Sequence, residues 1–422
     1  MRCQRASLLV VLVAALTAGC SDILGIHRLT GDASPSPDAD VTADADPAAD
    51  AATTVDGSDG CSSSATCGMC GRTCHTVGEA CIDGACVVAA CTTGFGNCNA
   101  TAADGCETDV RANPAHCGSC DRSCGGTACT DGVCEPTTFV AQEPYIASLA
   151  LRNGYVYWTH EDPPEIRRAP AGGGPVELAS PSTTTPWVLM TDSAGIYWLA
   201  LNGGPAGSVL KCTSPPCATP TVLATSALGS DSPYNATSDA SRIYWSAGGL
   251  APGLRTVSKA GGSTTTVASE GDDARGITLV QGVLYVTLCC GTRTGLYSVP
   301  ATGGTPGRLN GVMTGRLATY DNALYTAEND ILYRVATTGG MTPIDTASAT
   351  IEDLTGVSVD ASGIYAFSPS LAGIVRVPLS GGAPTLLSRA TGVVQIAVDD
   401  AAVYWIENTS AVNGRAVKRV VK

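Results

Sequence analysis

The sequence is poor in charge, in methionine and histidine, and in long apolar runs. Only 15% of its 422 residues are charged, against about a quarter in typical globular proteins, and it has 5 Met and 4 His. A basic excess is also lacking, because the formal net charge is −14, and this argues against a nucleic-acid-binding surface. The 49 Gly and 24 Pro favour turn-rich β-structure over a coiled coil or a helical bundle.

The only extended apolar run lies at the N-terminus. Arg2 and Arg5 flank the start of an eleven-residue apolar run at positions 6–16. A membrane-spanning helix needs about 20 residues, so this run predicts the hydrophobic region of a signal peptide, residues 1–19. No other segment approaches transmembrane length. The 20 cysteines also indicate a compartment outside the cytoplasm, where disulfides persist.

The apolar run ends in Leu16-Thr17-Ala18-Gly19-Cys20, which resembles a bacterial lipobox with Thr in place of the commoner Leu. The resemblance implies cleavage before Cys20 and a diacylglycerol on its sulfur. Because Ser21 is not acidic, it also implies an outer-membrane destination. The alternative is an ordinary secretory signal with a chance cysteine.

Residues 21–60 are acidic and contain few large apolar side chains. They include nine Asp and one Arg, a net charge of −8, and are otherwise mostly Ala, Pro, Thr, Ser and Gly. Such a segment cannot bury enough apolar surface to offset the entropy that it would lose on ordering. We therefore expect residues 20–60 to be a lipid anchor followed by a disordered tether.

Fourteen cysteines lie within residues 61–134 in a tandem pattern. Cys67-x2-Cys70-x3-Cys74-x6-Cys81-x4-Cys86 is repeated as Cys117-x2-Cys120-x3-Cys124-x4-Cys129-x4-Cys134. With Cys61 and Cys106, these runs predict two six-cysteine units, with Cys91 and Cys98 between them. The even number favours disulfides of undefined connectivity, and the 47 positions between Cys70 and Cys117 are too many for a zinc ribbon. We expect reduction to collapse residues 61–134 while sparing most of the remaining chain, which has its own core.

One motif of this region is Asp104-Gly105-Cys106-Glu107-Thr108-Asp109, followed by His116-Cys117-Gly118. It resembles the small Cys-rich modules of many bacterial surface lipoproteins. That resemblance implies a location and names no activity.

A repeat of about 41 residues fills the remainder of the chain, residues 137–422. A hydrophobic-Tyr or Tyr-Trp step recurs at intervals of 40, 47, 41, 40, 40 and 39 residues, the length of a four-stranded propeller blade. Glycine pairs follow most steps, as tight hairpins require. The sequence therefore predicts an all-β, seven-bladed propeller. The repeated tyrosines are Tyr157, Tyr197, Tyr244, Tyr285, Tyr325, Tyr365 and Tyr404.

The seventh repeat stops after three strands, at 417–422, whereas residues 137–141 read like the fourth strand at 265–268. We expect the N-terminal strand to complete the last blade and so close the ring. The phrases Ile243-Tyr244-Trp245 and Tyr157-Trp158-Thr159 resemble the Tyr-Trp-Thr-Asp propellers of lipoprotein receptors and their bacterial relatives. His160, which we expect on a loop, stands in place of the Asp, and the resemblance implies no ligand.

Four cysteines lie within the repeats. Cys212 and Cys217 replace the glycine pair of the second repeat, and we expect a disulfide that closes this hairpin. Cys289 and Cys290 are adjacent, which leaves open a vicinal disulfide, two thiols, or bonds to other chains.

Function is expected where the repeats differ. The repeated Tyr and Trp are predicted to be core, since packing requires them in every blade. The connections between second and third strands are long and dissimilar, and they share a face with the entrances of the innermost strands. Aromatic and Arg side chains there suit a sugar or an anionic peptide group; the alternative is an unoccupied channel mouth. The candidate binding residues are Tyr145, Trp187, Tyr234, Arg275, Arg316, Asp353 and Gln395.

The sequence shows no motif that pairs a nucleophile with a nearby base and no phosphate-binding loop. We therefore expect that the protein is not an enzyme and has no cofactor and no metal site. The favoured function is a lipid-anchored outer-membrane protein whose propeller is a binding or protein-interaction platform. Its partners would be outer-membrane lipid through Cys20 and a glycan or envelope protein on the loop-rich face, with no nucleic acid. The alternatives are a lactonase- or lyase-like propeller enzyme and an outer-membrane assembly factor.

Overall fold

The computed structural model describes residues 62–63, 66–67, 79–82, 85–88, 91–99, 106–201, 207–225, 233–247, 253–269, 273–289, 293–311, 316–352 and 356–422. The predicted signal peptide, Cys20, the tether, Asp353 and Cys290 lie outside these ranges. All regular elements in the described ranges are β-strands. Within them, no helix has the length and apolar character needed to cross a membrane.

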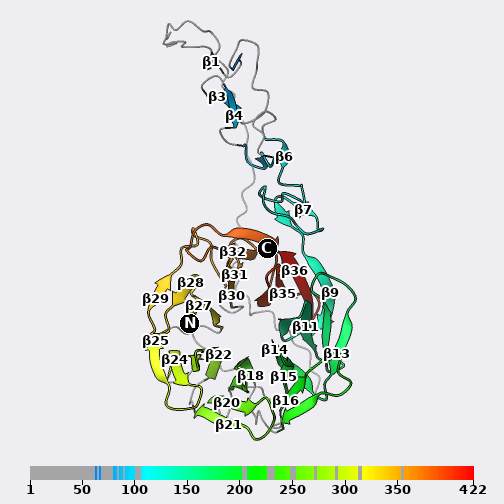
Figure 1. The fold of residues 1–422 in the computed structure, drawn as a ribbon, viewed down its shortest axis with the longest axis vertical. Helices are drawn as coiled ribbons and strands as arrows, with labels where there is room; N and C mark the ends of the chain where they lie inside the picture. Colours follow the sequence, from blue (N-terminus) through cyan, green and yellow to red (C-terminus); the bar gives the residue numbers. More distant parts are fainter. Residues whose placement is uncertain are drawn as a thin grey trace, which may run out of the picture.

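Seven four-stranded antiparallel sheets form a ring around a central axis (Figure 1). This confirms the predicted all-β, seven-bladed propeller. In blades 1 to 6 the chain enters at the innermost strand and moves outward through three hairpins. Glycines with positive φ occupy the turns between third and fourth strands, for example Gly261 (90°) and Gly262 (129°), where a side chain would strain the backbone.

Blade 1 contains β10 (Leu149–Arg152), β11 (Tyr155–His160), β12 (Glu165–Pro170) and β13 (Glu177–Pro181). Blade 2 contains β14 (Thr185–Asp192), β15 (Gly195–Leu201), β16 (Ser208–Cys212) and β17 (Thr221–Ala224). Blade 3 contains β18 (Pro233–Ser238), β19 (Arg242–Ala247), β20 (Gly253–Ser258) and β21 (Thr265–Ser269). Blade 4 contains β22 (Asp273–Val280), β23 (Val283–Cys289), β24 (Gly295–Pro300) and β25 (Gly307–Asn310).

Blade 5 contains β26 (Ala318–Tyr320), β27 (Ala323–Glu328), β28 (Ile331–Val335) and β29 (Met341–Pro343). Blade 6 contains β30 (Ser358–Asp360), β31 (Gly363–Ser368), β32 (Gly373–Val377) and β33 (Thr385–Arg389). Blade 7 contains β34 (Val393–Val398), β35 (Ala402–Asn408), β36 (Gly414–Val421) and, from the other end of the propeller sequence, β9 (Thr137–Pro144).

The core lies between neighbouring blades and is built from the repeated step. Each of the seven repeated tyrosines is at most 5% exposed, and the four tryptophans that follow some of them are fully buried. The cluster that contains Tyr157 and Trp198, for example, joins blades 1 and 2. The prediction that these aromatic side chains are core is therefore confirmed.

Pairing of β9 with β36 closes the ring as predicted. The two strands are antiparallel, with Val417 opposite Val140 and Arg419 opposite Thr137. Glu143 on β9 then reaches blade 1, where it accepts hydrogen bonds from Arg167 (2.6 Å) and from the indole of Trp158 (3.1 Å). The closing strand is thus tied to both blades that it joins.

His160 is not on a loop, as expected from the sequence, but is the last residue of β11 and only 4% exposed. Its Nδ1 lies 2.9 Å from the carbonyl oxygen of Pro163, and its Nε2 lies 3.9 Å from Glu143. The change from Asp to His at this position therefore supplies a buried contact beside the closing strand.

Eight cysteines of the N-terminal module form four disulfides within the described residues: Cys91–Cys106, Cys98–Cys120, Cys117–Cys129 and Cys124–Cys134. Cys91 and Cys98 therefore belong with the second run and are not a separate spacer between two six-cysteine units. The propeller disulfide Cys212–Cys217 is confirmed.

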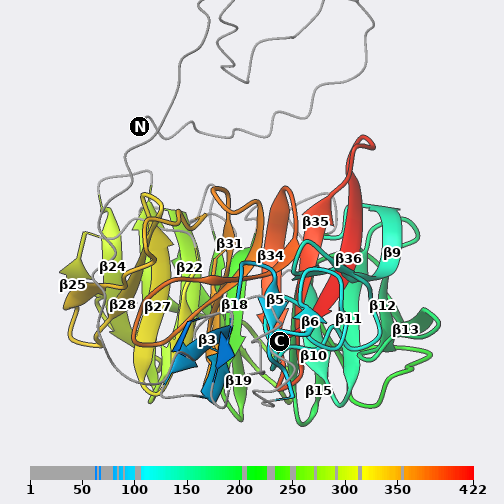
Figure 2. The same ribbon diagram turned by 90° about the horizontal axis from the view of Figure 1, so that it is seen from above.

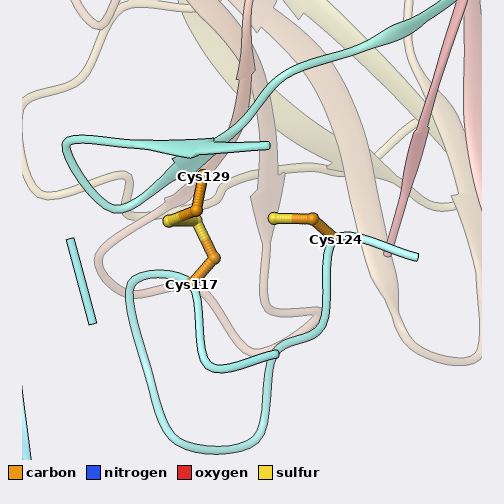
Figure 3. A group of neighbouring side chains, drawn as sticks. All are labelled: Cys117, Cys124 and Cys129. Carbon is orange, nitrogen blue, oxygen red and sulfur yellow. A yellow bond between two sulfur atoms is a disulfide. The ribbon is translucent and has the colours of Figure 1, made fainter. Parts of the chain in front are cut away.

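Sulfur atoms of Cys117, Cys124 and Cys129 all lie within 4.8 Å of one another (Figure 3). Two neighbouring disulfides account for this, since Cys117 bonds Cys129 and Cys124 bonds Cys134. No thiolate of this group remains to bind a metal, in agreement with the predicted preference for disulfides over zinc.

The short strands of the module lie outside the ring and extend from its rim beside blades 6 and 7 (Figure 1). They are β1 (Ser62–Ser63), β2 (Thr66–Cys67), β3 (Glu79–Ile82), β4 (Ala85–Val88), β5 (Phe95–Gly96), β6 (Thr108–Asp109), β7 (Cys129–Thr130) and β8 (Val133–Cys134).

The module is packed against the propeller and is not independent of it. Cys117, Cys124, Cys129 and Cys134 share one core cluster with Leu387 of blade 6 and with Trp405 and Val420 of blade 7. The hydroxyl of Ser388 donates to the carbonyl oxygen of Cys134 at 3.0 Å. The module and the propeller therefore share part of a core, a contact that the sequence did not predict.

Arg122 of the module supplies hydrogen-bond donors at a place where blade 7 has no turn between its third and fourth strands. In blades 2, 3 and 4, a backbone N–H of the turn between third and fourth strands donates to the outermost strand of the preceding blade; Gly262 donates to Leu223 and Cys217 to Ala179, both at 2.9 Å. Blade 7 has no such turn, because its third and fourth strands come from opposite ends of the propeller sequence. Arg122 instead donates to the carbonyl oxygens of Leu386 (3.0 Å) and Leu387 on β33.

Candidate functional site

The propeller has two chemically different faces, between which the strands run in side view (Figure 2). We call the loop face the one formed by the entrances of the innermost strands and the connections between second and third strands. We call the opposite one the turn face. It carries the hairpins between first and second strands and between third and fourth strands.

Three of the predicted binding residues occupy one equivalent position on the loop face. Trp187, Tyr234 and Arg275 are each the extra residue of a β-bulge in the innermost strand of blades 2, 3 and 4. A bulge leaves its extra residue out of the ladder and redirects the side chain. The fold therefore repeats the same backbone feature in three successive blades and places a different side chain on each.

These bulge residues interact across blades. The guanidinium carbon of Arg275 lies 4.4 Å from the centre of the Tyr234 ring, a stacked cation–π contact. Trp187, in the blade before that of Tyr234, is 40% exposed although it is a large aromatic residue on an innermost strand. An exposed indole beside a stacked Tyr–Arg pair is suited to contact a planar or charged group.

Tyr145 lies at the entrance to blade 1 and is held by the long hairpin of blade 7. Its φ is 52°, a left-handed conformation that is uncommon for a tyrosine. Its backbone N–H donates to the carbonyl oxygen of Asn413 (3.1 Å), and its hydroxyl accepts from the Asn413 side chain. The ring remains 44% exposed, so the strained backbone holds an aromatic side chain at the surface.

Arg316, just before β26, and Gln395 on β34 lie one position further along the chain than the bulge position of the other blades. We call this the inner-ring position, two residues before the one that pairs with the repeated tyrosine. The amide of Gln395 bonds both backbone groups of Leu149 in blade 1 at 3.0 Å. Its polar atoms therefore join two blades.

Arg316 has a different environment. Burial lowers the pKa of its guanidinium, while the residue as a whole stays partly exposed. It lies against blade 6, where a Cβ atom on Gly356 would come within 2.7 Å of the Arg316 Cβ.

The bulge position of blade 7 is occupied by Val394, which the sequence interpretation missed in favour of the next residue, Gln395. Counting back three residues from the partner of the repeated tyrosine would have found it. Asp353, the remaining candidate, lies outside the described residues.

Toward the turn face, the innermost strands line an open cavity of about 390 Å³. The described residues that line it include no charged side chain. The hydroxyls of Thr191 and Ser358 that face it donate to the neighbouring blades, at Leu151 (2.7 Å) and Ile396 (3.1 Å). The chemical diversity of the axis is therefore concentrated on the loop face. The lining residues are Ala150, Leu151, Thr191, Ala318, Thr319, Ser358, Val359, Ala397 and Val398.

The chain matches no model of a known protein family and no curated protein. Its fold is similar to a virginiamycin B lyase from Staphylococcus aureus, with 14% identity over 68% of this chain and 98% of that chain and a TM-score of 0.52. It is also similar to a streptogramin B lyase (17%, 68% and 97%, TM-score 0.51) and to YCF48 bound to D1 peptide (8%, 68% and 96%, TM-score 0.51). At these identities the likeness shows a shared propeller fold.

Proposed function

We propose that the protein is a lipid-anchored protein of the cell envelope, whose propeller binds a protein or glycan partner on its loop face. The observation that carries the binding proposal is the set of bulge residues Trp187, Tyr234 and Arg275. Packing needs the same residue in each blade, whereas these three equivalent positions carry three different side chains that reach the surface. Residues that break the repeat without filling the core are best explained by recognition.

Catalysis receives less support from the described residues. The similar structures include a lyase and a peptide-bound protein, so the fold is compatible with both classes of function. The histidine of the described propeller, His160, lies on a second strand and bonds Pro163, away from the innermost strands. The axial cavity carries no charged group that would serve as an acid or a base.

The loop face is tested with a matched control on the turn face. Tyr155, at the start of β11, also stacks on an arginine, Arg168, at 4.4 Å, so it reproduces the Tyr234–Arg275 contact on the other face. Glycans, peptidoglycan fragments and purified envelope proteins are screened by isothermal titration. For a partner found in this way, Trp187→Ala with Tyr234→Ala should weaken binding about tenfold to a hundredfold. Tyr155→Ala should leave the affinity unchanged.

Equal losses from the two faces would refute the site. Turnover of a screened compound would favour the enzyme class instead.

The anchor is a separate part of the proposal and rests on the sequence around Cys20. Membrane-extracted protein should begin at Cys20 and carry added acyl mass, and Cys20→Ala should release it from the membrane. Wild-type protein found free in the periplasm would contradict this part and leave the binding proposal intact.

A further inference from the structure

Arg316 is the one charged residue at the inner-ring position, and the residues that share this position with it in the other blades carry no charge that would neutralise it. Two other residues at this position accept a hydrogen bond from the next blade: Ser148 from the N–H of Leu189 (3.1 Å), and Gln395 from that of Leu149 (3.0 Å). Arg316 cannot take this role, because a guanidinium has donors and no acceptor. It therefore differs from the two residues at this position, Ser148 and Gln395, whose side chains join neighbouring blades.

The residues at the inner-ring position on either side of Arg316 are glycines. Gly276 stands there in blade 4 and Gly356 in blade 6, so neither neighbouring blade offers a side chain at this level. Within the described ranges, no carboxylate is paired with Arg316. Its one hydrogen bond there is made by its backbone carbonyl, which accepts from Thr326 at 2.9 Å.

Desolvating a cation without a counter-charge costs free energy, and proteins normally pair such groups. Burial lowers the pKa of the Arg316 guanidinium, which is the sign of this cost. The residue as a whole nevertheless stays partly exposed, so it borders solvent. A guanidinium in this state is well suited to receive an anion, since its N–H fork matches two oxygen atoms.

We propose that the loop face contains an anion subsite, in which Arg316 binds an oxygen-bearing anionic group, a carboxylate or a phosphate, of the partner. This deepens the proposed function and rests on it for the identity of the larger ligand. The stacked Tyr234 and Arg275 lie on the two blades before Arg316, and would contact the part of the ligand next to its anionic group.

The test uses the full chain and three small probes: N-acetyl-phenylalanine, its neutral amide, and inorganic phosphate. Arg316→Gln is compared with Arg334→Gln, which removes an exposed arginine from β28 of the same blade. Melting temperature is measured with and without each probe. The Nε–H signals of arginine are followed by NMR during each titration.

We expect an anionic probe to raise the melting temperature of the wild type and of Arg334→Gln, while the neutral amide does not. Arg316→Gln should bind that probe at least about tenfold more weakly, and without probe it should melt no lower than the wild type. A response to phosphate alone would assign the subsite to phosphate groups. A response to N-acetyl-phenylalanine alone would assign it to carboxylates.

Two results would overturn the inference. One is a lowered melting temperature of Arg316→Gln without probe, which would give Arg316 a structural partner. The other is the absence of any response that depends on Arg316. Failure of the proposed function looks different, because there Trp187→Ala and Tyr234→Ala would leave partner binding unchanged.

Discussion

Replacement of Arg122 by alanine tests how the ring is stabilised where its two ends meet. The side chain donates to the carbonyl oxygens of Leu386 and Leu387 on the outermost strand of blade 6. Burial, and to a smaller extent the nearby Arg376, lower the pKa of its guanidinium. Desolvation of this charge therefore costs free energy, which the two hydrogen bonds must offset.

The magnitude follows from what is lost and what is relieved. Hydrogen bonds to a charged group contribute about 1.5–3 kcal/mol each, and a buried carbonyl left without a donor costs about 1–3 kcal/mol. Removing a desolvated charge returns part of this. We therefore expect Arg122→Ala to lower the free energy of unfolding by about 2–4 kcal/mol, measured from urea midpoints of the full chain at constant slope.

Arg389→Ala is the matched control, because Arg389 also crosses from propeller to module. It pairs with Asp131 at 3.5 Å, but both side chains are more than half exposed, and such pairs contribute about 0–1 kcal/mol. If Arg122→Ala and Arg389→Ala shifted the midpoint equally, Arg122 would not be the substitute for the missing turn.

Two further predictions concern acid and reducing conditions. Burial opposes ionisation of Asp239, but hydrogen bonds from Tyr244 (2.8 Å) and from two backbone N–H groups outweigh it, so the pKa of this carboxyl is lowered from 3.8. The ionised carboxylate stabilises the fold at pH values above 3.8, and this stabilisation is lost as the pH falls through the lowered pKa. In Asp239→Asn, the free energy of unfolding should therefore fall less steeply with decreasing pH in this acidic range. An unchanged limb would contradict this. Reduction and alkylation of Cys117–Cys129 and Cys124–Cys134 should lower the melting temperature of the propeller itself, since these bonds lie in its core cluster; an unaltered propeller transition would show that the module is dispensable.

The seven-bladed fold was predictable because the features that form it repeat in the sequence. A buried tyrosine at intervals near 41 residues fixes the second strand of each blade, and glycine pairs fix the outer hairpins. The closure of the ring was predictable for the same reason, since a missing fourth strand and a spare N-terminal strand are both visible as departures from the repeat.

The docking of the module on the propeller was not predictable, because this contact occurs once and leaves no repeated pattern in the sequence. The missing turn of blade 7 follows from the predicted closure, but only the three-dimensional ring shows that two carbonyl oxygens of blade 6 lie where Arg122 can donate to them. Arg122 lies more than 260 positions before these carbonyls, and nothing in its local sequence distinguishes it from a surface arginine. The same holds for Cys91 and Cys98, whose partners depend on the folded path of the second run.

The binding face was predictable to within one or two residues, and the error has a physical cause. A bulge adds one residue to the strand without changing the pattern that precedes it, so the position chosen for blade 7 was Gln395 and not the bulge residue Val394. One position along an innermost strand separates two roles: a bulge residue such as Tyr234 stacks on Arg275, whereas Gln395 joins two blades. Arg316 was predicted from sequence to bind a ligand, as the bulge residues are. It lies instead at the inner-ring position, where Gln395 joins two blades, and its side chain makes no such bond to a neighbouring blade within the described residues. A charged side chain without this structural contact is the reason to test Arg316 for anion binding.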